Sequence, residues 1–398
     1  MMKILYITLE NLSLHKGSVV HVKEIVRGLR KLGHRVGLVA CSLNKSEKAD
    51  HFYNLNLMNE LPLKLLRVKK QPHAVSSIFL FLFLLWILPQ YDIIYARDYH
   101  TVIAAYFPRV LFKKKLVFEI NGIANEEQKL KSRSFLNGIL VFLIQKAEKI
   151  AGRCSDRIVS VTPQIVSYLM TNFCCPFNKV EVIGNAADTK KFRPINDESL
   201  LREKKKKIGI EKEELVIAFV GNLARWQGVS ILVESAIGLL SQGQKMKLLL
   251  VGDGPLKKEL MRKVLESEFE KEFIFTGMLD YEDIPFFINL ADICVAPFIF
   301  KRNQVTGVSP LKVFEYMACG KPVVCSRIEG LEFVETEGVG YLVEPEDIKD
   351  LQEKLLDLIR DPEKRIAMGR EGLHLVREKF DWGLKVAKIE KILLKTLA

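Results

Sequence analysis

The sequence has 398 residues, 48% of them hydrophobic and 27% charged, which is the composition of a soluble globular protein long enough for two domains. Its seven irregularly spaced cysteines exclude a disulfide framework, so we expect reduced thiols and a cytoplasmic protein. The net charge of +12 arises in the first half, because Met1–Lys190 holds 27 Lys and Arg against 14 Asp and Glu. A basic half of this kind either binds an anionic membrane, nucleic acid or phosphate, or its charge serves only ordinary solubility.

The first half alternates short apolar strands with helices. We expect no signal peptide, because Met1–Thr8 is a short strand followed by a polar loop. Lys3–Thr8 is a predicted strand, an amphipathic helix follows and ends at Gly33, and Arg35–Ala40 is a second strand. This βαβ pattern predicts a parallel doubly wound sheet. The first loop lacks G-x-G-x-x-G, which argues against a dinucleotide-binding dehydrogenase. Further strands are predicted at Leu65–Val68, Asp92–Tyr95, Leu116–Ile120, Arg157–Val161 and Val180–Ile183.

An unusual apolar segment, VSSIFLFLFLLWIL, occupies Val75–Leu88. It ends at Pro89 and is too short to cross a bilayer as a helix. It is either a buried crossover helix or a helix that dips into one face of a membrane. The flanking Lys69, Lys70 and Lys113–Lys115 favour the membrane interpretation.

The second half begins after a polar stretch, Asp188–Glu214, which we interpret as a linker. A second series of strands follows at Leu215–Val220, Lys247–Val251, Phe273–Thr276, Ile293–Pro297, Val323–Ser326 and Gly340–Val343. Two parallel sheets in tandem predict a cleft between their carboxyl edges. The predicted domains are residues 1–190 and 191–381, and we expect the amphipathic tail from Trp382 to pack back on the first domain.

The segment Gly307–Val324, GVSPLKVFEYMACGKPVV, reads as loop, short helix and strand. A helix that begins here offers unpaired N–H groups and a positive dipole end to an anionic ligand. Glu315 lies one turn into this otherwise apolar helix. Its carboxylate either accepts hydrogen bonds from a pair of ribose hydroxyls or only caps its own helix.

Several motifs occur together in the second half and, as an ordered set, are highly specific. They are Phe219–Leu223, Val251–Pro255, Phe275–Gly277, Ala291–Ile293 before Pro297, and Ser309–Ala318. In this order they resemble the GT-B glycosyltransferases of the large retaining family 4, and the first half matches more loosely through Gly33–His34 and Val182–Asn185. The resemblance covers essentially the whole chain. It implies an α/β fold of two tandem Rossmann-like doubly wound parallel-sheet domains that face a central cleft.

The resemblance also implies a donor site. Its residues would be Gly17, Ser18, Asn222, Gln227, Leu279, Ser309, Pro310, Leu311 and Glu315. In this assignment Glu315 holds the ribose hydroxyls, the backbone at Leu279 reads the nucleobase, and the loop at Gly17 meets the diphosphate. Taken by itself, Gly17 is either a turn residue or a position where the backbone can approach a phosphate.

The sequence departs from the family pattern at several positions. The first Glu of the E-x7-E element falls at Gly307, and the family's first-domain His falls at Asn121, which can hydrogen-bond but cannot act as a base. The family's basic pair matches Asn222 and Gln227, neither of them cationic. We therefore expect Arg225 and Lys312 to supply the charge that stabilises the diphosphate, and these two and Asn121 are the predicted catalytic residues. Outside the family pattern, His21 and Asp98–His100 are candidates for contact with acceptor or sugar, although structural roles are commoner for such residues.

The resemblance implies a retaining glycosyltransferase that moves a sugar from a UDP- or GDP-linked donor to a lipid-linked or cell-surface glycan acceptor. No cofactor and no metal is expected, because the histidines are scattered. The basic, apolar first half predicts peripheral contact with an anionic membrane face, and the lysine runs lack the interleaved aromatics of a nucleic-acid binder. Two alternatives stay open: a nucleotide-sugar 2-epimerase of the same fold, and a glycosyltransferase-like subunit that binds without turnover.

Overall fold

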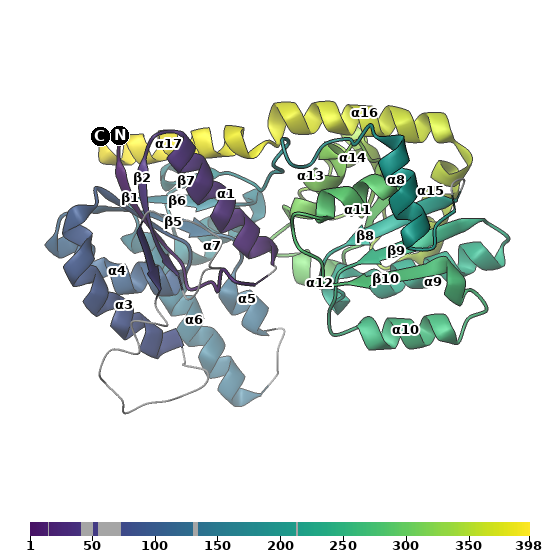
Figure 1. Ribbon diagram of the computed structural model, residues 1–398. Coiled ribbons are helices and arrows are strands. Elements are labelled where there is room, and N and C mark those ends of the chain that lie inside the picture. Colours follow the sequence, from purple (N-terminus) through teal and green to yellow (C-terminus); the bar gives the residue numbers. More distant parts are fainter. Residues whose placement is uncertain (15, 41–50, 55–72, 130–133, 212–213) are drawn as a thin grey trace. The chain divides into compact units, whose positions relative to one another are not determined.

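The computed structural model describes residues 1–14, 16–40, 51–54, 73–129, 134–211 and 214–398 (Figure 1). The chain forms two compact units, and they divide at slightly different positions from the predicted domains. The first unit comprises Met1–Gly184 together with Trp382–Ala398, and the second comprises Asn185–Asp381. Each unit is built around its own parallel sheet, which confirms the predicted fold class.

The sheet of the first unit has the strand order β3-β2-β1-β4-β5-β6-β7, and every pair in it is parallel. Its strands are β1 (Lys3–Ile7), β2 (Arg35–Ala40), β3 (His51–Asn54), β4 (Ile93–Ala96), β5 (Lys115–Ile120), β6 (Arg157–Ser160) and β7 (Val180–Val182). Six of them match predicted strands. The predicted strand at Leu65–Val68 lies outside the described residues, and β3 was not predicted.

Helices join these strands in the crossovers that a parallel sheet requires. They are α1 (Gly17–Lys31), α3 (His73–Ile87), α4 (Tyr99–Leu111), α5 (Ala124–Lys129), α6 (Phe135–Cys154) and α7 (Pro163–Phe173), with short 3-10 turns η1 (Leu88–Gln90) and η2 (Phe177–Lys179). Their starts follow ordinary capping rules. Asp98 accepts a hydrogen bond from the Thr101 N–H at the start of α4, and Thr162 caps α7 with Pro163 in the first helical position.

Helix α3 is a crossover helix that packs on the sheet. Its side chains Leu80, Leu84 and Ile87 are buried in the core of the first unit. The crossover interpretation of this segment is therefore confirmed for one side of the helix, while Leu82 and Trp86 remain exposed. Among the described residues, no helix combines the length and the apolar content needed to cross a bilayer.

The sheet of the second unit has the order β10-β9-β8-β11-β12-β13 and is also parallel. Its strands are β8 (Leu215–Val220), β9 (Met246–Val251), β10 (Phe273–Gly277), β11 (Ile293–Ala296), β12 (Val323–Ser326) and β13 (Gly340–Val343), all close to the predicted ranges. The helices are α8 (Glu198–Lys207), α9 (Val229–Ser241), α10 (Lys257–Leu265), α11 (Ile284–Leu290), α12 (Phe300–Asn303), α13 (Leu311–Ala318), α14 (Phe333–Thr336), α15 (Ile348–Arg360) and α16 (Pro362–Lys379), with 3-10 turns η3 (Arg225–Gln227) and η4 (Glu270–Glu272).

The stretch Asp188–Glu214 is not a linker. It contains helix α8, and Phe192 and Ile210 from its two flanks are fully buried in the core of the second unit. The segment looked like a linker because its many Lys and Glu residues outnumber these two apolar anchors.

Helix α17 (Trp382–Leu397) belongs to the first unit, although it follows α16 of the second (Figure 1). It packs on α1, where Val386 would be only 2.6 Å from a Cβ added at Gly28. The His34 ring Nε2 also lies 2.7 Å from the Glu390 carboxylate. A glycine on α1 thus gives α17 its close approach, and the apolar side of the tail is buried there.

Candidate functional site

In the second unit, the neighbouring strands β8, β9 and β10 end side by side at the carboxyl edge of the sheet. Each strand runs into a glycine, and Gly221 N–H donates to Val251 C=O while Gly252 N–H donates to Gly277 C=O. Gly221 has φ +140°, a conformation that favours glycine, and an added Cβ would lie 2.8 Å from Lys312 Nζ. The carboxyl edge of a parallel sheet is where open α/β folds bind ligands.

Helix α13 brings an acidic side chain to this part of the unit. Glu315 is only 5% exposed, and its Oε1 accepts a hydrogen bond of 2.8 Å from the Tyr281 hydroxyl. Tyr281 follows β10 and is itself held in place, since its ring packs on Phe192 and the Lys191 ammonium lies 3.8 Å above it. A buried carboxylate with its orientation fixed in this way is ready to accept hydrogen bonds from a ligand.

Lys312 lies one turn earlier on the same helix and supplies a cation. Its Nζ donates to Gln227 Oε1 at 2.7 Å and lies 3.9 Å above the Phe219 ring. No carboxylate among the described residues forms an ion pair with it. Burial lowers the pKa of Lys312 to about 7, although the Glu315 charge acts in the opposite direction. The phosphate of a bound ligand could therefore act as the counter-charge of this ammonium.

The loop before α13 is fixed by contacts within the unit. Ser309 Oγ accepts a hydrogen bond from the Asn185 N–H at 2.8 Å, and Ser309 C=O accepts one from the Asn185 side chain at 2.5 Å. Pro310 is the N-cap of the helix and has no side chain for capping, so the amides of Leu311 and its neighbour begin the helix without a side-chain acceptor.

The other predicted donor-site residues make different contacts. Arg225 is exposed in η3 and forms no hydrogen bond or ion pair with another described residue through its side chain. Asn222 is exposed at the end of β8, and Leu279 packs on the core. Gly307 has φ +59°, so the position of the missing family Glu has a backbone conformation that favours glycine.

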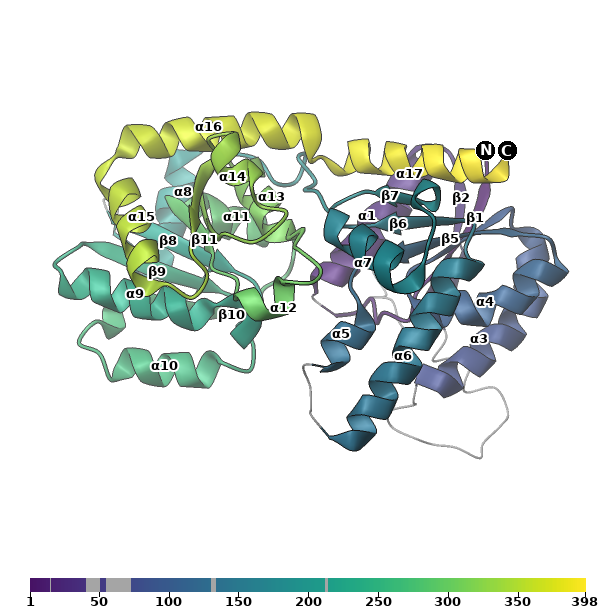
Figure 2. The same ribbon diagram turned by 180° about the vertical axis from the view of Figure 1, so that it is seen from behind.

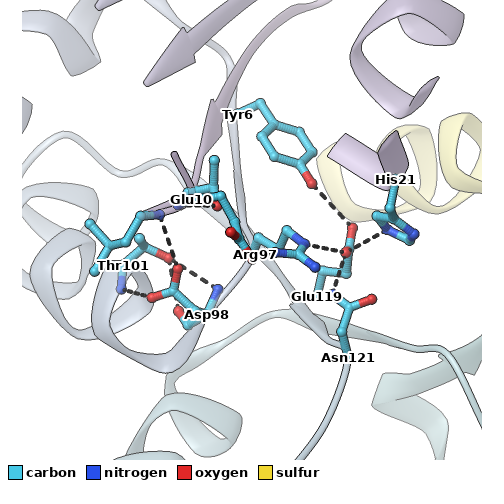
Figure 3. Close-up of polar contacts among 10 residues, drawn as sticks. Tyr6, Glu10, His21, Arg97, Asp98, Thr101, Glu119 and Asn121 are labelled. Atoms are coloured by element: carbon cyan, nitrogen blue, oxygen red, sulfur yellow. Dashed lines mark hydrogen bonds and ion pairs between the residues drawn. The ribbon is translucent and has the colours of Figure 1, made fainter. Parts of the chain in front are cut away.

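The first unit has a buried polar network at the carboxyl ends of β1, β4 and β5 (Figure 3). At its centre, Glu119 is fully buried on β5. One of its oxygens lies 2.7 Å from His21 Nε2 and 3.4 Å from Arg97 Nε. The same oxygen accepts a hydrogen bond of 2.6 Å from the Asn121 side-chain amide. Arg97 continues the network to Glu10 at 3.0 Å.

The charge of Glu119 determines how Asn121 is oriented. Burial alone would raise the pKa of Glu119, but His21 and Arg97, together with the hydrogen bonds from His21 and Asn121, hold it at about 2. The carboxylate is therefore ionised and can only accept, so the Asn121 amide must turn its nitrogen toward it. The side-chain oxygen of Asn121 then points away from Glu119, as Figure 3 shows, and is available to accept a hydrogen bond.

The remaining first-unit candidates have mixed roles. Gly17 is exposed and Ser18 half-buried in the first turn of α1, whose N-cap, Lys16, makes no side-chain capping bond. His21 is buried against the Trp382 ring and Glu119, which is a structural position. Asp98 caps α4 and also accepts from the Leu9 N–H.

Sequence reasoning missed Glu119 and Tyr281. A signal for Glu119 exists, because it is the one acidic residue inside the apolar strand KLVFEI. Tyr281 gave no comparable signal, since it stands in a polar turn 34 positions before Glu315.

We expect Glu119→Gln to destabilise the first unit by about 3–5 kcal/mol, because Arg97 and His21 would lose their buried counter-charge. In a unit of this size that lowers its melting transition by roughly 6–20 °C in differential scanning calorimetry. Glu10→Gln is the matched control, since its more exposed ion pair with Arg97 contributes about 1 kcal/mol or less. Equal shifts for the two variants would contradict a central role for Glu119.

Two family models match the chain. "Glycosyl transferases group 1" matches residues 202–374, and "Glycosyltransferase Family 4" matches residues 15–191. An uncharacterised glycosyltransferase of Methanocaldococcus jannaschii is 24% identical over 76% of this chain and 74% of its own length. A GDP-mannose-dependent monoacylated alpha-(1-6)-phosphatidylinositol monomannoside mannosyltransferase of Corynebacterium glutamicum is 28% identical over 59% of this chain and 62% of its own length, so this match spans under two thirds of that relative.

Solved structures with a similar fold cover almost the whole chain. Sucrose-phosphate synthase from Thermosynechococcus elongatus aligns with a TM-score of 0.79 at 19% identity and covers 99% of each chain. Anabaena Alr3699/HepE in complex with UDP aligns with a TM-score of 0.73 at 19% identity, covering 99% of this chain and 100% of that one. The two sheets, the motif order and the two family matches agree, and the chain belongs to the group 1, family 4 glycosyltransferases of the GT-B fold.

Proposed function

We propose that this glycosyltransferase moves a sugar, with retention of configuration, from a UDP- or GDP-linked donor to a lipid-linked or cell-surface glycan acceptor. The observation that carries the proposal is the buried Glu315 carboxylate, fixed by Tyr281 one turn into α13 and with the Lys312 ammonium one turn before it. A carboxylate that accepts from two neighbouring hydroxyls suits a ribose, and a cation beside it suits a diphosphate.

The protein's main task in such a reaction is to stabilise the charge of the leaving nucleoside diphosphate. Lys312, Arg225 and the first amides of α13 supply this positive charge in the second unit, and the first turn of α1 at Gly17 offers further amides. We propose that these groups act without a metal ion or other cofactor.

The bond between the sugar C1 and the phosphate oxygen breaks, and a bond from C1 to the acceptor oxygen forms on the same face of the sugar. The acceptor's hydroxyl proton passes to the departing phosphate oxygen, so the chain needs no basic residue for this step. Asn121 cannot take a proton, and we assign its outward side-chain oxygen to a hydroxyl of the bound sugar.

Named relatives support the nucleotide and acceptor classes. The Corynebacterium relative is GDP-mannose-dependent and acts on a phosphatidylinositol mannoside, and a Staphylococcus aureus relative, 26% identical, is a capsular polysaccharide glycosyltransferase. The Anabaena neighbour was solved with UDP and with UDP-glucose. We accordingly propose a cytoplasmic protein that works at the inner face of the cell membrane.

We expect UDP or GDP to raise the melting temperature, and ADP to raise it less. A nucleotide at about a hundred times its dissociation constant adds roughly 2.7 kcal/mol to the stability of the native state, or about 5–10 °C for one unit. The measurement is a thermal shift followed by turnover assays with a panel of UDP- and GDP-sugars. No shift with any nucleotide would contradict the proposal, whereas a shift without transfer or hydrolysis would favour the subunit that binds without turnover.

A further inference from the structure

Three neighbouring helices of the first unit, α3, α4 and α6, carry large apolar side chains on their outer surfaces. Figure 2 shows these helices grouped in the same part of the first unit, and α4 packs on both α3 and α6. We call the exposed set the apolar face. It consists of Leu82, Trp86, Ile103, Tyr106, Phe107, Val110, Leu111, Phe135, Leu136, Ile139, Leu140, Phe142, Leu143 and Ile150.

The spacing of these residues shows that the face is continuous along each helix. On α4 the exposed residues Ile103, Tyr106, Phe107, Val110 and Leu111 recur at intervals of three and four, so they form one helical stripe. The opposite side of α4 is also apolar and packs on the sheet. An apolar stripe that faces outward on a helix whose inner side is already buried is not needed for the core of its own unit.

Helix α6 extends this surface. Its 20 residues correspond to about 30 Å, and only Glu148, Ala151 and Gly152 near its C-terminal end are buried. In its first half, Phe135 is 82% exposed and Phe142 is 55% exposed, a large amount for aromatic side chains in water. This half therefore exposes its apolar side chains with little cover from the described residues of its unit.

Within α3, α4 and α6 themselves, the exposed charges are cationic. The only acidic residue in α3, α4 and α6 is Glu148, which is buried and accepts from the Ala124 and Asn125 N–H groups. The cations, in contrast, reach the surface, with Lys146 5.2 Å from the Phe142 ring centroid and with exposed Lys113, Lys115 and Arg153 close by in the chain. The nearest acidic groups lie outside these three helices: Glu127 is exposed on α5, which packs on α6, and Asp156 pairs with Arg109 of α4. Apolar helices whose own exposed charges are cationic are complementary to anionic lipid.

We propose that the apolar face of α3, α4 and α6 seats the first unit on an anionic lipid bilayer, with α6 lying along the headgroup region. The proposal deepens the proposed function and rests on it only for the idea that the acceptor is lipid-linked. It differs from the sequence-based expectation, which placed the membrane contact on residues 75–88, because α3 contributes two large exposed side chains while α4 and α6 contribute the rest.

The test is co-sedimentation of the full chain with vesicles of phosphatidylcholine alone and of phosphatidylcholine containing phosphatidylglycerol. We expect binding to the anionic vesicles that weakens with salt, and at least about tenfold weaker binding for the double variant Phe135→Glu, Phe142→Glu. The matched control is Leu265→Glu, an exposed apolar residue on α10 of the second unit, which should bind vesicles as the wild type does.

Several results would overturn the proposal: no binding of the wild type to anionic vesicles, unchanged binding of the double variant, or equal loss with Leu265→Glu. Light scattering gives a further test. If the wild type is a dimer and the double variant is a monomer, a second copy of the chain covers the apolar face and the lipid proposal is wrong. UDP and GDP thermal shifts are recorded on every variant. Normal shifts without vesicle binding would refute the lipid proposal and leave the proposed function standing, whereas vesicle binding without any nucleotide shift would do the reverse.

Discussion

Replacing Glu315 by alanine is expected to weaken the binding of UDP or GDP by at least about a hundredfold. The carboxylate would accept hydrogen bonds from both ribose hydroxyls, and a hydrogen bond to a charged group contributes about 1.5–3 kcal/mol. Because Tyr281 holds Glu315 in place at 2.8 Å, its orientation is largely set before the ligand arrives. Isothermal titration calorimetry on folded protein, checked by an unchanged circular dichroism spectrum, measures the loss.

A double-mutant cycle separates recognition of ribose from general damage to the site. The cycle compares UDP with 2′,3′-dideoxy-UDP on the wild type and on Glu315→Ala. We expect the dideoxy nucleotide to bind the wild type weakly and to bind the variant about as well as UDP does. Tyr281→Phe keeps the carboxylate and removes only its hydrogen-bond donor, so it should cost less than Glu315→Ala. If the two nucleotides lost affinity equally on both proteins, Glu315 would not hold the ribose.

The fold was predictable because its strands are continuous apolar runs between glycine-bearing loops, the pattern of strands buried on both faces. The β8 run LVIAFV is an example. Strand β3, HFYN, was not predicted because it is short and begins and ends with polar residues. The segment from Asp188 to Glu214 was misjudged for a related reason: composition averages over a window, whereas the single buried side chains of Phe192 and Ile210 hold the segment to the core.

Only those residues of the candidate site that stand within one contiguous sequence motif could be predicted. The helix that carries Glu315 stands in one contiguous motif, so its ends and its acidic residue could be inferred. Its partners could not, since Lys312 meets Gln227 across 85 positions and Asn121 is oriented by a carboxylate whose ionisation depends on His21, a hundred residues earlier. Contacts of this kind depend on how strands are ordered in a sheet, which periodicity does not specify.

Nucleotide affinity is expected to fall as the pH rises above 7, and Lys312 is the reason. Its pKa of about 7 leaves the free protein's amine mostly neutral at pH 8, whereas a bound diphosphate favours the ammonium. Binding should therefore take up nearly one proton at pH 8, and the affinity should drop by up to about tenfold per pH unit between pH 7 and 9. Calorimetry in two buffers of different protonation enthalpy measures this uptake, and above pH 7 the nucleotide's own phosphates are already ionised.

The stability of the free protein should change with pH in the opposite direction. The pKa of Lys312 is lower in the folded chain than its ordinary value of 10.5, so the unfolded chain binds the extra proton and the folded state gains stability as the pH rises from about 7 to 10.5. Lys312→Met removes both trends, because its side chain neither titrates nor pairs with a phosphate. A variant that kept the wild type's proton uptake would show that another group is responsible.

A charge exchange tests whether the cation's location matters more than its identity. The Lys312 ammonium lies 2.7 Å from Gln227, and the family resemblance places a basic residue at the position of Gln227, so a lysine from either residue can bring positive charge to the same place. We expect Lys312→Gln to weaken UDP or GDP binding by about tenfold to a hundredfold at pH 7, and the double variant Lys312→Gln, Gln227→Lys to recover most of it. A lysine at position 227, in the η3 turn, would not pack on the Phe219 ring as Lys312 does and would be more exposed to water, so its pKa should lie closer to the ordinary value. The recovered binding should therefore lose most of its pH dependence above pH 7. Two outcomes would show that Lys312 acts through something other than its charge beside Gln227. One is nucleotide binding that recovers but keeps the wild type's pH dependence. The other is a folded double variant whose nucleotide binding does not recover.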